Sequence, residues 1–161
     1  MFNIIPQPVS VIFNADKKGF TLHSGTTISP FPFTEDLISF ARKVFNKKII
    51  MHDEDTGEER SIILKLDDAV ENEEGYTLKC ENRRVYIYAK TENGLFYGLQ
   101  TLKQMLLQTD GKIPYTEIVD YPRFSYRGYM LDCGRYFYPV EDVKRVVDLM
   151  ALHKLNTLHW H

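Results

Sequence analysis

The sequence contains very few cysteines, with only Cys80 and Cys133 among 161 residues. The two lie far apart and match neither the spacing of a zinc site nor that of a redox pair. A small disulfide-stabilised domain would need more of them. We therefore expect two reduced thiols without a chemical role.

An excess of charge of one sign is also missing. The chain has 20 basic and 22 acidic residues, a net charge of -2 and a pI near 6.2. Proteins that bind nucleic acid or anionic membranes usually carry a basic surplus on the domain that does so. We therefore expect neither nucleic acid nor a membrane as a partner.

Long apolar runs are absent too. No stretch approaches the roughly 20 apolar residues of a membrane-spanning helix. The N-terminal segment MFNIIPQPVSVIF has neither the charged start nor the long apolar centre of a signal peptide. The chain as written is therefore expected to contain no membrane span and to stay in the cytoplasm.

The residues that are present indicate a folded globular chain. Hydrophobic residues make up 43% and charged residues 26%, which is ordinary for such proteins. Aromatic residues reach 13%, with ten tyrosines, and this predicts half-buried sheet faces or a stacking surface. The length suits one domain, or one domain and part of a second.

The first 120 residues combine short strands with two helices. Strand patterns occur at 9–13, 19–22, 26–28, 61–66, 75–80, 84–89 and 115–120. Helix patterns cover 34–46, with Thr34 as the N-cap, and 93–108, where apolar residues recur at helical spacing. This pattern predicts an α+β two-layer sandwich, an antiparallel or mixed sheet with helices on one face.

Two local patterns add detail to this sandwich. Gly94 and Gly98 lie four residues apart in the second helix, which predicts close backbone packing on one helix face. Tyr86 and Tyr88 alternate with apolar residues in VYIYA, so that strand has one aromatic face. Such a face fits either stacking on a sugar or packing in a core or domain interface.

Residues 121–161 follow a different pattern. A strand at 126–132, a loop at 133–139, a helix at 140–154 and a strand from 156 onward predict one βαβ unit, with Asn156 stopping the helix. The helix should pack through a single apolar stripe, formed by Val143, Val146, Val147, Met150 and Ala151. One such unit cannot cover both faces of its sheet, so it predicts the start of a larger parallel sheet or barrel.

This second region resembles the beginning of the catalytic barrel of glycoside hydrolase family 20, the β-N-acetylhexosaminidases. The similarity rests on Asp-x-Pro-Arg-Phe at 120–124, Arg-Gly-x-x-Leu-Asp at 127–132 and Lys-x-Asn-x-x-His-x-His at 154–161. Upstream, IIPQPV, EEGYTLKC and NGLFYGLQTLKQML are similar to the small domain that precedes this barrel. The resemblance implies an accessory α+β domain over 1–120 and, over 121–161, the first strand, first helix and second strand of a truncated (β/α)8 TIM barrel.

The resemblance also implies a chemistry. The family removes terminal N-acetylglucosamine or N-acetylgalactosamine by a retaining, substrate-assisted mechanism, in which the substrate acetamido oxygen attacks and an Asp-Glu pair assists. The Glu-Asp pairs of this chain lie at 35–36, 54–55 and 141–142, in helix starts or a loop and not at strand ends. We therefore expect an N-terminal fragment that is inactive alone, has no catalytic residue, and ends before the catalytic end of its second strand. The resemblance implies no cofactor and no metal, and glycans containing N-acetylhexosamine as partners of the full-length enzyme.

One substrate-binding residue is implied within the chain. Arg135, in CGRYF, matches the family arginine that binds the hydroxyls at positions 3 and 4 of the terminal sugar, although Tyr136 replaces the usual histidine after it. A guanidinium suits this role because it offers a rigid fork of donors. From the residues alone, Arg135 could equally pair with Asp132 or be solvated. Asp132 and His161 are expected to support the site.

Other interpretations remain beside this one. His159 and His161 share one strand face, which permits metal binding, but no third ligand is near in the sequence and hydrogen-bonded barrel histidines are expected. The acidic run 53–55 does not fit an EF-hand loop and predicts a solvated turn. The chain could instead be a standalone carbohydrate-binding or protein-interaction module, or a structural domain. The uncovered edges of 121–161 predict fraying, folding back on the first domain, or a homo-oligomer.

Overall fold

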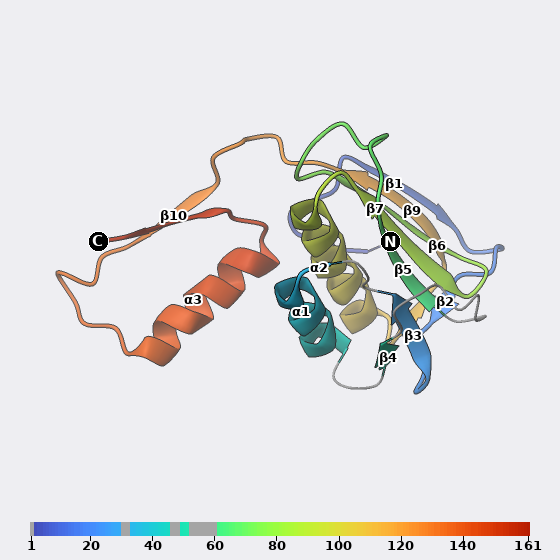
Figure 1. The fold of residues 1–161 in the computed structure, drawn as a ribbon, viewed down its shortest axis with the longest axis horizontal. Coiled ribbons are helices and arrows are strands. Elements are labelled where there is room, and N and C mark those ends of the chain that lie inside the picture. Colours follow the sequence, from blue (N-terminus) through green and yellow to red (C-terminus); the bar gives the residue numbers. More distant parts are fainter. Residues whose placement is uncertain (1, 30–32, 46–48, 52–60) are drawn as a thin grey trace. The chain divides into compact units, whose positions relative to one another are not determined.

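The computed structural model describes residues 2–29, 33–45, 49–51 and 61–161. The chain forms two compact units, Met1–Tyr121 and Pro122–His161 (Figure 1). The acidic run 53–55, for which a solvated turn is predicted, lies outside the described residues.

A seven-stranded mixed sheet forms the body of the first unit. Its spatial order is β1-β9-β6-β7-β5-β3-β4. The strands are β1 (Ser10–Asn14), β3 (Thr26–Ser29), β4 (Ile49–Met51), β5 (Ser61–Leu66), β6 (Tyr76–Glu81), β7 (Arg84–Ala89) and β9 (Tyr115–Asp120). From β1 to β7 the neighbours are antiparallel, and from β7 to β4 they are parallel. A separate antiparallel pair joins β2 (Phe20–Thr21) to β8 (Lys112–Ile113).

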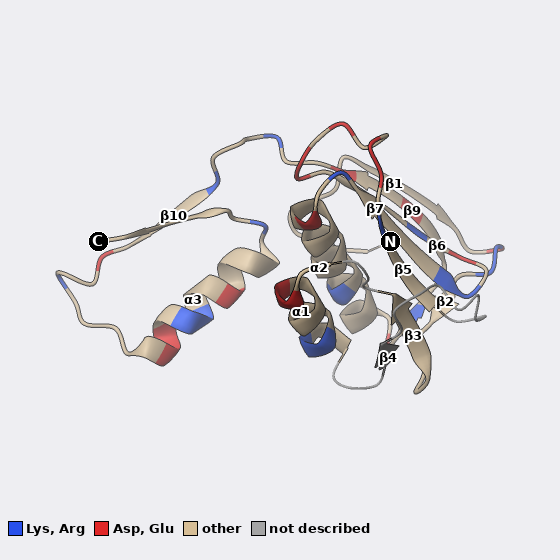
Figure 2. Cartoon of the chain, in the orientation of Figure 1, with Lys and Arg blue, Asp and Glu red and all other residues tan. Residues whose placement is uncertain are grey.

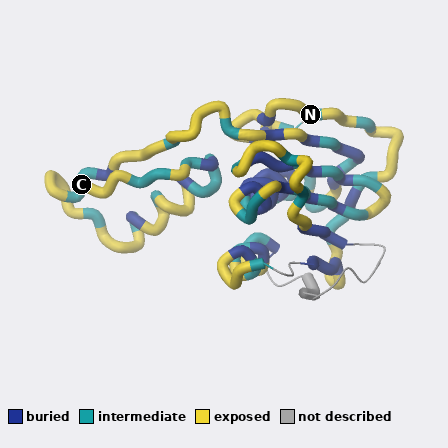
Figure 3. The backbone as a smooth tube through the Cα atoms, turned by 45° about the horizontal axis from the view of Figure 1, so that its top comes forward, coloured by how far each residue is buried: buried dark blue, intermediate teal, exposed yellow. Residues whose placement is uncertain are grey.

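Two helices cover one face of this sheet, as the sequence predicts. They are α1 (Glu35–Phe45) and α2 (Glu92–Gln108), and Figure 1 shows them on the same side. In α2 the residues facing the sheet are fully buried, among them Leu95, Leu99, Leu102 and Met105. Figure 3 shows dark blue, buried stretches along both the helices and the strands of this unit. The alternation in β7 buries Val85, Ile87 and Ala89 beneath α2 and leaves the tyrosines on the opposite face.

The predicted close approach at the two glycines of α2 is confirmed. A Cβ added at Gly94 would lie 2.2 Å from the Gly75 carbonyl oxygen, and one at Gly98 would lie 2.5 Å from Cγ2 of Ile87. Both distances are shorter than van der Waals contact, so a larger side chain would push the helix away from the sheet. Gly94 and Gly98 therefore determine how near α2 lies to β6 and β7.

The second unit is a single βαβ element, which confirms that part of the prediction. It consists of β10 (Gly128–Leu131), α3 (Val140–Leu152) and β11 (Thr157–Trp160). The two strands are parallel, with Gly128 opposite Thr157 and Leu131 opposite Trp160. The described residues contain no closed barrel.

The helix of this unit buries less of its stripe than expected. Val143 and Met150 are buried together with Leu131 of β10, whereas Val147 is 47% exposed. Two strands are too narrow a surface to cover the full apolar stripe of a helix. Figure 3 accordingly shows this unit largely in yellow and teal.

The end of α3 also differs from the prediction. The helix stops at Leu152, and Lys154 takes a left-handed conformation with φ of 58°. The Lys154 N–H donates to the Ala151 carbonyl at 3.1 Å, and the Leu155 N–H donates to the Met150 carbonyl at 2.8 Å. These two bonds form a Schellman C-cap. Asn156 is therefore not the helix stop, and it lies directly before β11 instead.

Two short strands, β4 and β8, were not expected from the sequence. They contain three and two residues, too few to show a periodic pattern, and they exist because a neighbouring strand offers hydrogen-bonding partners. In the part of the chain that the structure describes, no helix is both long enough and apolar enough to cross a membrane.

Candidate functional site

The predicted site residues of the second unit meet at the carboxyl ends of its two strands. Asp132 directly follows β10, and His161 directly follows β11. The His161 N–H donates to the Leu131 carbonyl at 2.9 Å, and the Cys133 N–H donates to the His161 carbonyl at 2.8 Å. The parallel ladder thus continues past both strands. It brings together Asp132, Arg135 and His161, which we call the strand-end cluster.

Asp132 shapes the turn that carries Arg135. Its Oδ1 accepts hydrogen bonds from the backbone N–H groups of Gly134 and Arg135, both at 3.0 Å. Aspartate commonly stabilises turns in this way, through donors two and three residues on. Its Oδ2 lies 3.4 Å from Nε of Arg135. Both carboxylate oxygens therefore hold the arginine, one through the backbone and one through the side chain.

The Arg135 guanidinium remains accessible despite this pairing. The side chain is 91% exposed, whereas that of Asp132 is 24% exposed. Among the described residues no hydrogen bond engages the two terminal nitrogens of Arg135. An exposed ion pair of this kind contributes only about 0–1 kcal/mol, so a ligand could compete for the arginine. The pairing with Asp132, one alternative left open by the sequence, is present and leaves part of the donor fork available.

His159 of β11 and His161 directly after it do not form a metal site with their described neighbours. The rings of His159 and His161 are 6.1 Å apart and nearly perpendicular, and both residues are exposed. Among the described residues no group of three histidine, cysteine or acidic side chains could hold a metal ion. A Cβ on Gly134 would lie 3.9 Å from Cδ2 of His161, so the imidazole lies beside the Asp132 turn.

Tyr136, the departure from the family pattern, is close to the cluster in the chain. Its side chain is exposed and packs edge-to-face against Tyr138, with ring centroids 5.3 Å apart. The turn therefore presents an aromatic ring next to Arg135. This is a surface on which an apolar sugar face can stack.

Sequence reasoning missed the contacts that hold the strand pair together. At the carboxyl end, Nε1 of Trp160 donates to Sγ of Cys133 at 3.1 Å. At the amino end, Oδ1 of Asn156 accepts from the Arg127 N–H at 3.0 Å, and its Nδ2 donates to the Ser125 carbonyl at 2.7 Å. Asn156 belongs to a quoted family motif, but only the structure shows that it joins β11 to the segment before β10.

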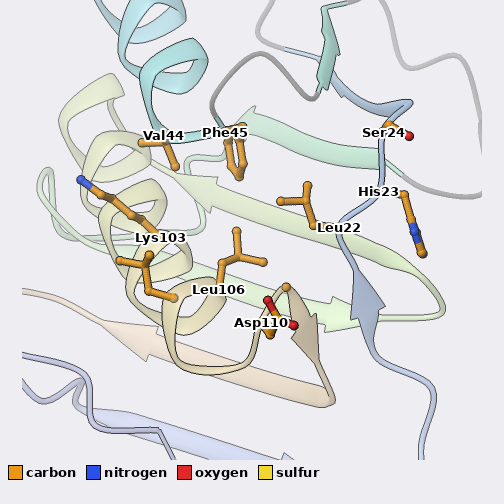
Figure 4. Close-up of a pocket in the computed structure, with 10 residues that line it drawn as sticks. Leu22, His23, Ser24, Val44, Phe45, Lys103, Leu106 and Asp110 are labelled. Carbon is orange, nitrogen blue, oxygen red and sulfur yellow. The ribbon is translucent and has the colours of Figure 1, made fainter.

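The first unit contains a separate hollow of about 590 Å³ near the end of α2. It is lined by Leu22, His23, Ser24, Val44, Phe45, Lys103, Leu106, Leu107, Asp110 and Gly111. In Figure 4 Lys103 and His23 extend in opposite directions, so these two polar groups do not converge on one ligand. The strand-end cluster, which lies at the carboxyl ends of two parallel strands, is the better candidate.

Comparisons with known proteins place both units in one family. The model described as glycosyl hydrolase family 20, domain 2, matches residues 1–121, and the model for the family 20 catalytic domain matches residues 124–161. A beta-hexosaminidase of Porphyromonas gingivalis is 38% identical over 176 residues, covering 99% of this chain and 22% of that protein. The beta-hexosaminidase subunit A2 of Dictyostelium discoideum is 29% identical, covering 99% of this chain and 32% of its own length.

Solved structures show the same similarity. The beta-N-acetylhexosaminidase of Bacteroides fragilis has a TM-score of 0.86 and 25% identity, covering 98% of this chain and 32% of that one. The exo beta-N-acetylglucosaminidase of Vibrio harveyi, solved in complex with N-acetylglucosamine, has a TM-score of 0.75 and 29% identity, covering 98% and 25%. The chain thus spans about a fifth to a third of the length of these relatives.

Proposed function

This chain belongs to glycosyl hydrolase family 20, and we propose that it supplies domain 2 and the start of the catalytic domain of a β-N-acetylhexosaminidase. In this proposal the strand-end cluster binds the terminal N-acetylhexosamine of a glycan. The observation that carries it is the turn in which Asp132 holds Arg135 at the carboxyl ends of two parallel strands.

The position of the cluster supports a binding role. In parallel α/β sheets and barrels, ligands bind at the carboxyl ends of the strands, where the loops of neighbouring strands meet. Arg135 follows the first strand of the unit and His161 the second, so both contribute to one such end. A lysine would offer a single charged point here, whereas arginine offers two parallel donors to neighbouring hydroxyl oxygens.

Each member of the cluster has a distinct part in this proposal. Arg135 binds two hydroxyls of the terminal sugar through its terminal nitrogens. Asp132 is a positioning residue, because its oxygens are engaged by the turn and by Nε of Arg135. His161 borders the same turn and forms part of the wall beside the sugar.

The cluster itself contains no general acid. Asp132 is its only carboxylate. That group accepts the hydrogen bonds that hold the turn, so it is not placed to donate a proton. The family resemblance implies that an Asp-Glu pair at a later barrel strand assists the attack of the acetamido oxygen. We therefore propose that the 161-residue chain binds but does not hydrolyse, and that hydrolysis requires the further barrel strands of a longer enzyme.

The test uses a chimera in which residues 1–161 replace the matching segment of the Porphyromonas gingivalis relative. Release of nitrophenol from 4-nitrophenyl N-acetyl-β-glucosaminide is measured for the chimera, for its Arg135→Lys variant, and for Arg145→Gln on the exposed side of α3 as a control. Loss of the arginine fork should lower kcat/KM at least about tenfold, since each hydrogen bond to a charged group contributes about 1.5–3 kcal/mol. The control should retain its activity.

Two results would overturn the proposal. If the Arg135→Lys chimera had the same kcat/KM as its parent, the donor fork of Arg135 would not bind the sugar. Release of nitrophenol by the purified 161-residue chain above the buffer rate would show that the general acid lies within it.

A further inference from the structure

The face of the first sheet that points away from α1 and α2 carries an unusual set of side chains. Alternation places Arg84, Tyr86 and Tyr88 of β7 on this face, since Val85, Ile87 and Ala89 are buried on the other. Residues two apart on a strand are about 6.6 Å from one another. The three side chains therefore form a row, with the cation at the end where β6 turns into β7.

The two tyrosines of this row are arranged in parallel. Their ring centroids are 6.2 Å apart and their planes differ by 5°. Both residues are half-buried, because neighbouring strands support them from the sides. Rings held in one orientation bind a flat ligand with little loss of side-chain freedom.

A small hollow of about 450 Å³ lies at the cationic end of the row. Its lining consists of Lys18, Asn82, Arg83, Arg84 and Tyr86. The turn is held in place because the N–H groups of Asn82 and Arg83 donate to the carbonyls of Lys18 and Gly19, at 2.9 and 2.7 Å. Figure 2 shows Lys and Arg segments at this end of the sheet. Segments distant in the sequence thus bring three basic side chains to one hollow that includes a tyrosine.

The charges beside the row are mixed. Lys65 lies in register with Tyr88, and Lys79 lies in register with Tyr86. Lys79 bridges two carboxylates, at 3.1 Å from Glu81 and 3.0 Å from Glu117. The described basic side chains of the row, the hollow and these neighbours number five (Lys18, Lys65, Lys79, Arg83 and Arg84). They stand against three carboxylates, because the charge of Asp67 also acts on Tyr88. This excess is local, because the whole chain has a net charge of -2.

We propose that Lys18, Arg83, Arg84, Tyr86 and Tyr88, which we call the β7 strip, bind an anionic oligosaccharide. A sulfate or carboxylate of the glycan occupies the basic hollow, and the next sugar rings lie against the tyrosines. Arginines suit oxyanions of either kind, and aromatic rings suit the apolar faces of sugars. The carboxylates of Glu81 and Glu117 accept hydrogen bonds from sugar hydroxyls.

The same carboxylates argue against a nucleic acid. A strand with a phosphate at every residue would meet Glu81 opposite Arg84 and Glu117 beyond Lys79, whereas a glycan carries hydroxyls between its anionic groups. The β7 strip lies in the first unit and the strand-end cluster in the second, so the inference does not rest on the proposed hydrolase function.

The test measures binding of the 161-residue chain to a κ-carrageenan hexasaccharide by titration calorimetry. This glycan contains sulfate but no N-acetylhexosamine, so it is not the sugar proposed for the strand-end cluster, and the variants in β7 report on the β7 strip alone. We expect saturable binding of the sulfated hexasaccharide. The affinity of the parent chain for the desulfated hexasaccharide should be about tenfold lower, and so should the affinity of an Arg84→Gln variant for the sulfated one. The double variant Tyr86→Leu/Tyr88→Leu should lose affinity for the sulfated hexasaccharide by a similar factor. The control Arg42→Gln on α1 should keep the affinity of the parent. An alginate hexamer that binds through the same residues would support the inference with carboxylate as the anion.

Three outcomes would overturn the inference. The first is an absence of binding by both anionic glycans. The second is equal affinity for an oligoglutamate peptide or an oligonucleotide of the same charge, which would show attraction to any polyanion. The third is binding that Arg84→Gln leaves unchanged while the chain stays folded by circular dichroism. Arg84→Gln on the open face keeps the test decisive even if the tyrosine double variant fails to fold.

Discussion

Replacing Tyr76 by phenylalanine tests how the first unit is held together. The Tyr76 hydroxyl is buried and lies 2.6 Å from Oγ1 of Thr101 in α2 and 2.8 Å from Oδ2 of Asp120 at the end of β9. This hydroxyl of β6 thus joins α2 to the end of β9, the last strand before the second unit. Tyr76→Phe removes both hydrogen bonds and keeps the ring that packs in the core.

The expected loss follows from these two bonds. A buried hydrogen bond to a charged group contributes about 1.5–3 kcal/mol and a neutral one about 1 kcal/mol. We expect Tyr76→Phe to lower the free energy of unfolding by about 2–3 kcal/mol at pH 7.5. For a chain of this length that corresponds to a fall in Tm of about 5–10 °C. Urea denaturation followed by circular dichroism measures it, with Tyr86→Phe on the open face as the matched control.

The pH dependence of the free energy of unfolding gives a second, independent test of these contacts. Burial, and then the negative charge of Asp120, raise the pKa of Tyr76 well above its ordinary value of 10.0. Above pH 10 the unfolded chain loses this proton while the folded chain keeps it. The stability from this group is therefore complete below pH 10 and decreases above it by about 1.4 kcal/mol per pH unit. Tyr76→Phe lacks this decrease, so the difference between the two proteins should shrink from pH 10 to 11.

Two results would refute this reasoning. The first is a variant as stable as the parent at pH 7.5. The second is a stability difference that stays constant between pH 9 and 11. Burial also raises the pKa of the Cys80 thiol, but that contribution is the same in both proteins and cancels in the comparison.

Three further predictions concern packing and accessibility. Gly98→Ala places a Cβ 2.5 Å from Cγ2 of Ile87, so it should lower the free energy of unfolding by about 1–3 kcal/mol, and a thermal melt that matches the parent would contradict the close packing. Cys80 is fully buried and its raised pKa keeps it protonated, so a thiol reagent such as DTNB should modify only Cys133 in the native chain and both thiols in denaturant; two equal native rates would contradict this. Asn156→Ala removes two hydrogen bonds to the segment before β10 and should cost the second unit about 1–3 kcal/mol. Amide exchange at Arg127 should then quicken, and unchanged protection would count against this role of Asn156.

The sequence by itself determined the elements with strong periodicity. The 3.6-residue period of α2 predicted which of its sides is buried, because residues three and four apart share one helix face. The two-residue period of β7 predicted one aromatic face but left open whether that face is buried. The close packing at Gly94 and Gly98 was also predictable, since only close contact explains two such residues in a helix. The family motifs named the strand-end residues. For Arg135 they supplied a sugar-binding role that remains a prediction.

Only the tertiary structure decided the features that depend on partners distant in the chain. The strand order, with β5 between β7 and β3, and the short strands β4 and β8 follow from pairing and have no local pattern. The same is true of the Trp160–Cys133 contact and of the basic hollow in which Lys18 meets the turn after β6. The physical reason is common to all of them. Periodicity records which face of an element is buried, whereas register and long-range pairing place side chains within hydrogen-bonding distance of one another.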